Sequence, residues 1–215
     1  MFIVFEGGEG VGKTTQIELL AQRLRQGGQS VTTLIEPGST AIGRRLRTLI
    51  LALVEPLTPL TEALLFASAR AQLVTTEIEP ALRENKIVLC DRFSSSTLAY
   101  QGFGKDVPLS ALIALNVIAC QGIEPTLTIL LDLDPALGIQ RKRVQSGLNP
   151  FENAVLQYSN KVRTGYLKLA QYNPHRWLIV DASQPIEDTH AQIYAHVSEL
   201  LALPQSVKAS PRRTD

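Results

Sequence analysis

The segment Gly7 to Thr14 constrains the fold of this chain more than any other feature. Its sequence, Gly7-Gly8-Glu9-Gly10-Val11-Gly12-Lys13-Thr14, fills the pattern G-x-x-x-x-G-K-[ST] at every fixed position. An apolar run precedes it and a helical pattern follows it, which is the context in which this pattern forms a phosphate-binding loop. The glycines let the backbone curl so that successive N–H groups face phosphate oxygens.

The two residues that end this segment carry side chains suited to a nucleoside triphosphate. Lys13 is expected to reach the β- and γ-phosphates, and the Thr14 hydroxyl is expected to ligate Mg²⁺. A helix beginning near Lys13 adds the positive end of its dipole. A glycine-rich turn without a ligand is disfavoured, because sequence and context agree. GTPases, transport ATPases and small-molecule kinases share the pattern, so it predicts the ligand class but not the reaction.

Short apolar runs alternate with longer helical patterns along the chain, which predicts an α/β fold. The runs are continuous rather than alternating, as is typical of strands covered on both faces. We therefore expect a five-stranded parallel sheet with helices on both faces. The predicted strands are Phe2–Phe5, Val31–Ile35, Ile87–Cys90, Leu127–Leu131 and Trp177–Val180.

Four stretches between or after these strands have helical spacing. Apolar residues repeat every three or four positions from Ile17 to Leu24, and a last helix is expected from Ile186 to Leu201. Thr58 and Pro59 fit the N-cap and first turn of another helix. Its predicted apolar face is Leu60, Ala63, Leu64, Ala67 and Ala71. The fourth has Leu109, Leu112 and Ile113 on one face, with Asn116 as a polar intrusion.

Composition excludes several classes of protein. The 215 residues are 45% apolar and 19% charged, with a formal net charge of +1. The chain thus lacks the excess of positive charge that would favour a nucleic-acid partner. No apolar run approaches the roughly 18 residues that span a bilayer, and the N-terminus lacks the features of a signal peptide. Two cysteines form no disulfide framework, so a cytoplasmic protein without a membrane partner is expected. We expect one domain over residues 1–203, followed by a disordered tail over 204–215.

Asp91 and Arg92 follow the third predicted strand. A carboxylate at the carboxyl edge of a parallel sheet lies near the phosphate loop, so Asp91 is expected to hold Mg²⁺ directly or through water. Arg92 is suited to clamp a phosphate, although a surface salt bridge is the simpler alternative. Asp132 and Asp134 are rival magnesium ligands after the fourth strand. We interpret Asp134 as an N-cap instead, because it precedes Pro135 and a helical stretch.

Two further features suggest a nucleotide base and a mobile lid. Phe66 and Arg70 lie four residues apart and so share a helix face, although a core phenylalanine beside a surface arginine is the commoner case. The segment 141–152 contains a basic cluster and Asn149-Pro150, which predicts a mobile lid loop between two helices. In a regular helix Arg141 and Arg143 would point about 200° apart, so both face one phosphate only if the segment is irregular. A solvated helix face is the alternative interpretation.

Several segments, taken in order, closely resemble the thymidylate kinase family over about residues 1 to 200. They are the phosphate loop, Glu36-Pro37-Gly38, Phe66 with Arg70-Ala71-Gln72, Asp91-Arg92-Phe93 with Ser96 to Gly102, Gly165-Tyr166-Leu167 and Asp181-Ala182-Ser183. The resemblance implies a P-loop NTPase fold of the nucleoside monophosphate kinase type. It also implies transfer of the γ-phosphoryl group of ATP to dTMP, giving dTDP and ADP for dTTP synthesis, and a homodimer.

The resemblance assigns roles to individual residues. It implies catalytic roles for Lys13, Asp91, Arg92, Arg141 and Arg143, and a magnesium site at Thr14 and Asp91. ATP is expected to contact Gly7, Gly8, Glu9, Gly10, Val11, Gly12, Lys13, Thr14, Thr15, Ala182 and Ser183. dTMP is expected to contact Glu9, Pro37, Arg47, Phe66, Arg70, Arg92, Ser96, Thr97, Tyr100 and Gln101. Within that set, Phe66 would stack on thymine, Arg70 would donate to its carbonyl, and Arg47 and Arg92 would clamp the phosphate.

The chain departs from the family pattern at the arginines. Gly10 follows Glu9, so the loop has no arginine, and Gln145 and Asn149-Pro150 stand where lids often carry further arginines. We therefore expect Arg141 or Arg143 to contact the transferring phosphate. A nucleotide-dependent switch or a protein that binds without turnover remains the alternative. A G-protein is disfavoured, because Asn160-Lys161 continues as Val162-Arg163 and not as a guanine-binding motif.

Overall fold

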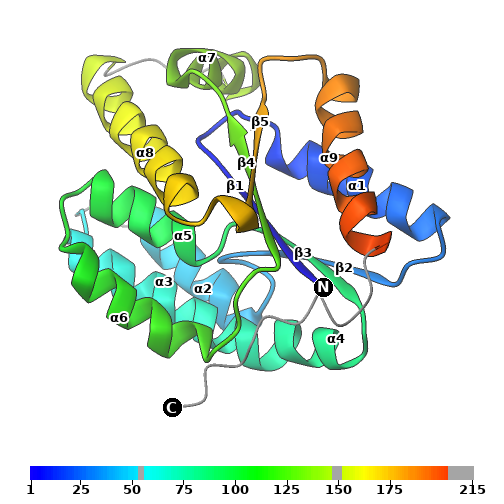
Figure 1. Cartoon of the computed structure of the whole chain (residues 1–215). Helices are drawn as coiled ribbons and strands as arrows, with labels where there is room; N and C mark the ends of the chain where they lie inside the picture. Colours follow the sequence, from blue (N-terminus) through cyan, green and yellow to red (C-terminus); the bar gives the residue numbers. More distant parts are fainter. Residues whose placement is uncertain (53–55, 147–151, 203–215) are drawn as a thin grey trace.

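A parallel β-sheet forms the centre of the molecule in this computed structural model, which describes residues 1–52, 56–146 and 152–202 (Figure 1). Its strand order is β2-β3-β1-β4-β5. The strands are β1 Phe2–Glu6, β2 Val31–Ile35, β3 Ile87–Asp91, β4 Leu127–Asp132 and β5 Trp177–Asp181. The predicted five-stranded parallel sheet is confirmed. Strand β1 lies between β3 and β4, so the connections that leave these strands run to opposite sides of the sheet. In α/β proteins, ligands bind in the crevice beyond the carboxyl ends of the strands at such a point.

Helices cover both faces of this sheet. On one face, Ile3 and Phe5 pack with Leu20 of α1 and Ile193 of α9. On the other, Phe2 and Val4 pack against the helices that follow β2. The helices are α1 Lys13–Gln26, α2 Ala41–Ala52, α3 Pro59–Leu73, η1 Val74–Ile78, α4 Glu79–Arg83, α5 Ser94–Thr97, η2 Leu98–Phe103, α6 Leu109–Cys120, α7 Pro135–Ser146, α8 Glu152–Tyr172, η3 Pro174–Arg176 and α9 Ile186–Ala202.

The two outer strands differ from their prediction. Val31–Ile35 and Trp177–Val180 were expected to be buried on both faces, but β2 and β5 are the sheet edges and only one residue of each is fully buried. Helices therefore bury the central strands more completely than the two edge strands, and an apolar run alone does not distinguish the two cases. The three central strands match the prediction, since all their apolar residues are buried.

Helix α3 begins as predicted, but its buried face is rotated. The Thr58 hydroxyl oxygen accepts from the Thr61 N–H at 3.3 Å, which caps the helix. Ala63 and Ala67 are buried as expected, whereas Leu60 and Leu64 are about half exposed. The buried face of α3 includes the charged residue Arg70, because part of this face contacts polar groups such as the Glu36 carboxylate.

The predicted lid loop 141–152 is helical over its first half. Helix α7 continues to Ser146, so residues 141 and 143 lie in a helix and not in the predicted loop. The remaining part of the predicted loop, 147–151, lies outside the described residues, as does the predicted tail 204–215. No helix in the described ranges is long and apolar enough to cross a bilayer.

Candidate active site

The phosphate loop joins β1 directly to α1. Gly7, Gly10 and Gly12 have φ values of 139°, 67° and 90°, which favour glycine over any residue with a side chain. Lys13 Nζ folds back over the loop and donates to the carbonyl oxygens of Gly7 at 3.2 Å and Gly8 at 2.8 Å. Burial, and then the positive charge of Arg92, lowers the pKa of Lys13 to about 7.

Helix α7 packs against this loop with no side chain between the two backbones. A Cβ atom on Gly10 would collide with the carbonyl oxygen of Gly138, and one on Gly138 would collide with the carbonyl oxygen of Glu9. Glycine at both positions therefore permits backbone contact between the start of α7 and the phosphate loop. This contact places α7 directly against the loop.

A cavity of about 1050 Å³ opens over the loop and the start of α1. Its lining includes the predicted ATP-contacting residues Glu9, Gly10, Val11, Gly12, Lys13, Thr14, Thr15, Ala182 and Ser183, together with Asp91, Arg92, Arg141 and Lys142. We call it the donor cavity. Gly7 and Gly8 do not line it; they line a smaller cavity behind the loop, and their carbonyls serve Lys13.

The predicted magnesium ligands lie together in the donor cavity. The Thr14 hydroxyl donates to Asp91 Oδ2 at 3.4 Å, and the buried Asp91 Oδ1 has no hydrogen-bond partner among the described residues. A hydroxyl beside a carboxylate with an unused buried oxygen is a donor set that fits Mg²⁺. Of the rival acids, Asp132 is held by Arg163 at 2.7 and 2.8 Å, and Asp134 accepts from the Ala136 N–H at 2.8 Å as an N-cap does.

A second cavity of about 340 Å³ lies between α3, η2 and the end of β2, and we call it the acceptor cavity. All ten residues expected to contact dTMP line it: Glu9, Pro37, Arg47, Phe66, Arg70, Arg92, Ser96, Thr97, Tyr100 and Gln101. Glu36, Glu62 and Tyr158 join them. Glu9, Glu36, Arg47 and Arg92 line both cavities, so the two meet at these residues.

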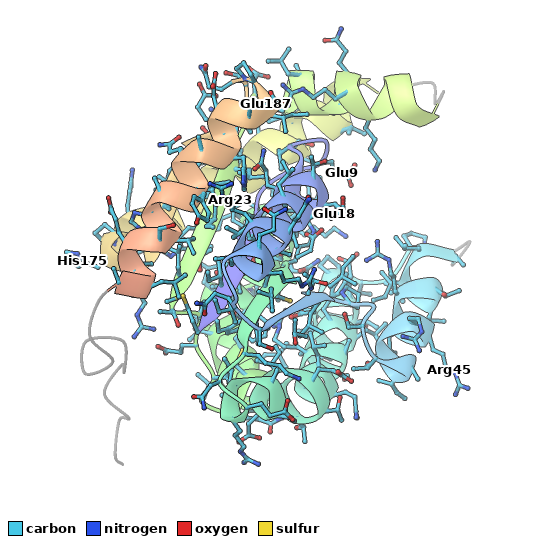
Figure 2. All side chains as sticks on the ribbon, turned by 90° about the vertical axis from the view of Figure 1, so that its right-hand side faces the viewer. Glu9, Glu18, Arg23, Arg45, His175 and Glu187 are labelled. Carbon is cyan, nitrogen blue, oxygen red and sulfur yellow. The ribbon has the colours of Figure 1, made fainter. Side chains whose placement is uncertain are left out.

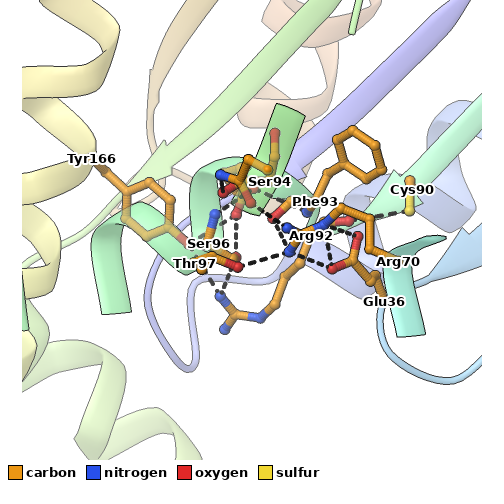
Figure 3. Close-up of polar contacts among 11 residues, drawn as sticks. Glu36, Arg70, Cys90, Arg92, Phe93, Ser94, Ser96, Thr97 and Tyr166 are labelled. Atoms are coloured by element: carbon orange, nitrogen blue, oxygen red, sulfur yellow. Dashed lines mark hydrogen bonds and ion pairs between the residues drawn. The ribbon is translucent and has the colours of Figure 1, made fainter. Parts of the chain in front are cut away.

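Arg70 is the most deeply buried charge in the acceptor cavity, at 1% exposure. Its Nε donates to both carboxylate oxygens of Glu36, at 2.8 and 3.0 Å (Figure 3). Nη1 donates to Asn116 Oδ1 at 2.5 Å and Nη2 donates to Thr97 Oγ1 at 2.8 Å. Burial alone would lower the pKa of Arg70, but the carboxylate of Glu36 outweighs burial and raises it. The guanidinium is therefore charged and fixed before any ligand arrives.

The polar residue in α6 is explained by this network. Asn116 accepts from Arg70 and donates from Nδ2 to the Ser94 carbonyl oxygen at 3.0 Å. The commoner arrangement of a core phenylalanine beside a surface arginine is reversed here. Phe66 is half-buried against the cavity, and Arg70 lies beneath it in the interior.

Arg92 is held by a second buried network, centred on Glu6. The backbone of Arg92 is left-handed, with φ of 69°, and its Nη1 donates to the Gly7 carbonyl at 3.1 Å and to Tyr166 Oη at 3.2 Å. Tyr166 in turn donates to Glu6 Oε2 at 2.8 Å, and Ser96 Oγ donates to the same oxygen at 2.6 Å. Burial raises the pKa of Glu6 despite the nearby Arg92.

The remaining predicted cations are placed less firmly. Arg47 Nη1 donates to the Pro37 carbonyl at 3.0 Å at the junction of the two cavities, whereas Arg45 points away from the molecule (Figure 2). Arg141 Nη1 donates to the Ala182 carbonyl at 2.9 Å. Lys142, which follows it, forms an ion pair with Glu9 instead. The side chain of Arg143 lies outside the described part of the structure.

Sequence reasoning missed several residues of the site. Glu6 ends an apolar strand directly before the phosphate loop, and an acid there is a signal of a buried acceptor. Glu62, Phe66 and Arg70 are spaced by four residues, which places all three on one stripe of α3. The pattern Glu36-Pro37-Gly38 by itself indicates no role for Glu36. Asn116 interrupts an apolar helix, but its spacing alone does not link it to the site.

Comparisons with known proteins agree with this geometry. A family model described as thymidylate kinase matches residues 5–193. The chain is 45% identical over 199 residues to a thymidylate kinase of Deinococcus radiodurans, covering 93% of this chain and 97% of that one. It is 43% identical to a thymidylate kinase of Synechococcus sp. (strain JA-3-3Ab), covering 99% and 100%. A crystal structure of thymidylate kinase from Ehrlichia chaffeensis superposes with a TM-score of 0.73 at 32% identity, covering 94% of this chain and 98% of that one. The fold is thus that of the P-loop NTPases, and the chain belongs to the thymidylate kinase family.

Proposed function

We propose that this chain transfers the γ-phosphoryl group of ATP to dTMP, producing dTDP and ADP. The observation that carries the proposal is the junction of the two cavities. A phosphate loop lines one, a buried arginine beside an aromatic ring lines the other, and Arg92 lines both. Two polyanions bound in these cavities would meet end to end, which is the arrangement that phosphoryl transfer requires.

On the acceptor side, the chain's own residues orient dTMP. Phe66 would stack on the base and Arg70 would donate to its carbonyl. Arg47 and Arg92 would clamp the phosphate, and Glu9 would lie near the sugar. Fixing Arg92 in a buried network before binding lowers the cost of ordering it, so the acceptor oxygen is held in line with the γ-phosphate.

On the donor side, backbone N–H groups of the phosphate loop would hold the β- and γ-phosphates. Lys13 would leave the carbonyls of Gly7 and Gly8 and pair with the phosphates. A Mg²⁺ ion held by Thr14 and Asp91 would neutralise phosphate charge. A dTMP phosphate oxygen forms the new P–O bond, and the bond to the β-phosphate oxygen breaks, so ADP leaves with that electron pair. No side-chain nucleophile is needed.

The lid contributes its cations unequally in this proposal. Arg141 is directed toward the edge of the donor cavity at Ala182, where the resemblance implies the adenine lies. We propose that Arg143, two residues further along the chain, reaches the transferring phosphate. The expected signature is a loss of kcat in Arg143→Ala that exceeds the loss in Arg141→Ala. Equal and near-normal turnover in both variants would contradict any role of these arginines at the phosphate.

We also propose that residues 1–203 form a single cytoplasmic domain that pairs as a homodimer. Half-exposed or exposed apolar side chains gather on α3 and on the neighbouring α6: Leu60, Leu64, Ile113, Val117 and Ile118. Val117 is 68% and Ile118 is 74% exposed. A second copy of the chain covering this face would remove these apolar side chains from water, and the hydrophobic effect would favour that association.

Sedimentation equilibrium tests the homodimer. The wild type is expected to sediment as a dimer, and the double variant Val117→Asp with Ile118→Asp as a monomer. Tyr172→Asp changes a residue of α8 that is even more exposed, at 83%, and it should leave the dimer intact. A monomeric wild type would overturn the proposal.

The activity is tested by ADP release in the presence of ATP and Mg²⁺. dTMP, dUMP, dCMP, dGMP, AMP and no acceptor would be compared, with chromatography to identify the diphosphate and Lys13→Ala as the blank. ADP release that depends on dTMP and yields dTDP is the expected result. Release without an acceptor would instead favour an ATPase or switch, and dTMP binding without turnover would favour a protein that only binds.

A further inference from the structure

Glu62 is a partly buried carboxylate, with its side chain 16% exposed, that none of the roles above uses. It lies in the first turn of α3, one turn before Phe66, and it lines the acceptor cavity. Its Oε2 accepts from Gln101 Nε2 at 2.8 Å and from Lys105 Nζ at 2.6 Å. Glu62 thus joins α3 to η2 and the residues that follow η2.

This contact fixes which way the Gln101 amide faces. A side-chain amide has a donor end and an acceptor end of nearly equal shape, so its orientation depends on its partners. An ionised carboxylate only accepts hydrogen bonds, so Gln101 must turn its NH₂ group toward Glu62. The Lys105 ammonium balances the carboxylate charge, and the Gln101 backbone is also held, because its carbonyl accepts from the Val107 N–H at 3.0 Å. The carbonyl oxygen Oε1 is left as the end that a ligand in the cavity can meet.

We propose that Glu62 is a positioning residue that makes Gln101 an acceptor, and thereby selects an imide-edged pyrimidine over cytosine. Arg70 presents only donors, and Gln101 so oriented presents an acceptor. Thymine and uracil offer the complementary edge, a carbonyl oxygen beside a ring N–H. Cytosine offers the opposite edge, an amine beside an unprotonated ring nitrogen, so it would leave buried polar groups unpaired. The inference rests on the proposed dTMP kinase function.

The test measures kcat/KM for dTMP and dCMP in the full chain. Glu62→Gln keeps the size of the side chain but lets it donate as well as accept, so Gln101 is no longer forced into one orientation. We expect the ratio of kcat/KM for dTMP over dCMP to fall at least tenfold. The KM for dTMP should rise, while kcat at saturating dTMP changes less than about threefold. Lys105→Met removes the other partner of Glu62 and should keep the ratio within about twofold.

A double-mutant cycle separates positioning from a merely structural role. In a Gln101→Ala background, Glu62→Gln should no longer change the ratio, because the group it orients is gone. Equal losses for dTMP and dCMP in Glu62→Gln, or the same change of ratio in both backgrounds, would overturn the proposal. Thermal unfolding verifies that each variant folds.

A wild-type measurement keeps the proposal testable even if Glu62→Gln does not fold. dTMP methylated at the ring N–H should be a poor acceptor, at least 100-fold below dTMP in kcat/KM. Acceptance of the methylated nucleotide at the rate of dTMP would overturn the assignment of Gln101 as an acceptor. A wild type that forms no dTDP would instead contradict the proposed function, and that outcome is distinct from each of the others.

Discussion

The acceptor and donor cavities adjoin, yet they are built in different ways. The acceptor cavity is lined by side chains that are buried and hydrogen-bonded before any ligand arrives, above all Arg70 on Glu36 and Arg92 on the network of Glu6. The donor cavity is about three times larger and is built around a curled backbone, with the exposed pair of Lys142 and Glu9 at its rim.

The difference follows from what each cavity must recognise. A triphosphate is bound by backbone N–H groups and a few charges, which require glycines rather than particular side chains. A base is distinguished from other bases by hydrogen-bond polarity, which requires side chains held in one orientation. The acceptor cavity should therefore respond to substitutions through stability and selectivity, and the donor cavity through nucleotide affinity.

The largest effect is expected at the buried ion pair. Glu36→Gln removes the charge that compensates Arg70 and leaves a guanidinium unpaired in the interior. Loss of one partner of a buried pair costs about 3–5 kcal/mol of unfolding free energy. Urea denaturation of wild type and variant, analysed with a common m value, measures the difference.

Glu79→Gln is the matched control for that substitution. Glu79 pairs with Arg83 four residues later on the surface of α4, with the arginine side chain 74% exposed. Such pairs contribute about 0.3–0.5 kcal/mol. Similar losses in the two variants would show that the acceptor network is no more rigid than the surface, and would refute the comparison.

The next largest effect is expected where α7 touches the phosphate loop. Gly10→Ala places a methyl group against the Gly138 carbonyl at a position with φ of 67°. Backbone strain of this kind costs about 1–3 kcal/mol, and the collision displaces either the loop or the lid helix. We expect ATP affinity, measured by calorimetry, to fall at least tenfold.

Gly28→Ala is the matched control: it introduces a similar backbone strain, but without a steric collision and at a position that does not line the donor cavity. Gly28 has φ of 79° after the end of α1, and a Cβ there would meet nothing within 4 Å. It should lose stability but bind ATP as the wild type does. Unchanged ATP affinity in Gly10→Ala would mean that the donor cavity tolerates movement of its backbone.

Lys13 predicts a smaller, pH-dependent effect on the donor cavity. With a pKa of about 7 in the free protein, Lys13 loses its proton as the pH rises above 7, whereas bound phosphates would keep it protonated. Binding therefore takes up a proton, and ATP affinity should fall by up to tenfold per pH unit, about 1.4 kcal/mol, between pH 7 and 9. Calorimetry at pH 8 in buffers with different ionisation enthalpies measures the uptake.

Two checks accompany this prediction. Lys13→Ala should bind ATP weakly at every pH and remove the slope. In the unliganded protein the sign is opposite: the unfolded chain holds this proton up to pH 10.5, so the free energy of unfolding should increase between pH 7 and 10.5. ATP affinity that stays constant from pH 7 to 9 would contradict a lowered pKa.

The sequence predicts the donor cavity in more detail than the network beneath the acceptor cavity, for a physical reason. The phosphate loop is a contiguous segment with its own pattern, so the donor-cavity residues Glu9 to Thr14 could be predicted from spacing alone, although Gly7 and Gly8 of the same pattern do not line that cavity. Residues 36, 70 and 116 lie on different elements, and only folding joins them. Periodicity also failed at Leu60 and Leu64, because helical spacing identifies an apolar stripe but not whether the sheet or another surface covers it.

The smallest effect is expected at the rim of the donor cavity. Lys142 and Glu9 form an ion pair with each side chain about half exposed, and such pairs contribute less than about 1 kcal/mol in high dielectric. Lys142→Met keeps the stem of the side chain, so it should change the free energy of unfolding by no more than that amount.

A double-mutant cycle with Glu9→Gln should give a coupling energy that disappears in about 1 M salt, where the Debye length falls to about 3 Å. A coupling above 2 kcal/mol that survives salt would mean that the lid helix is locked to the phosphate loop by charge as well as by the glycine contact. The donor cavity would then be as rigidly built as its neighbour.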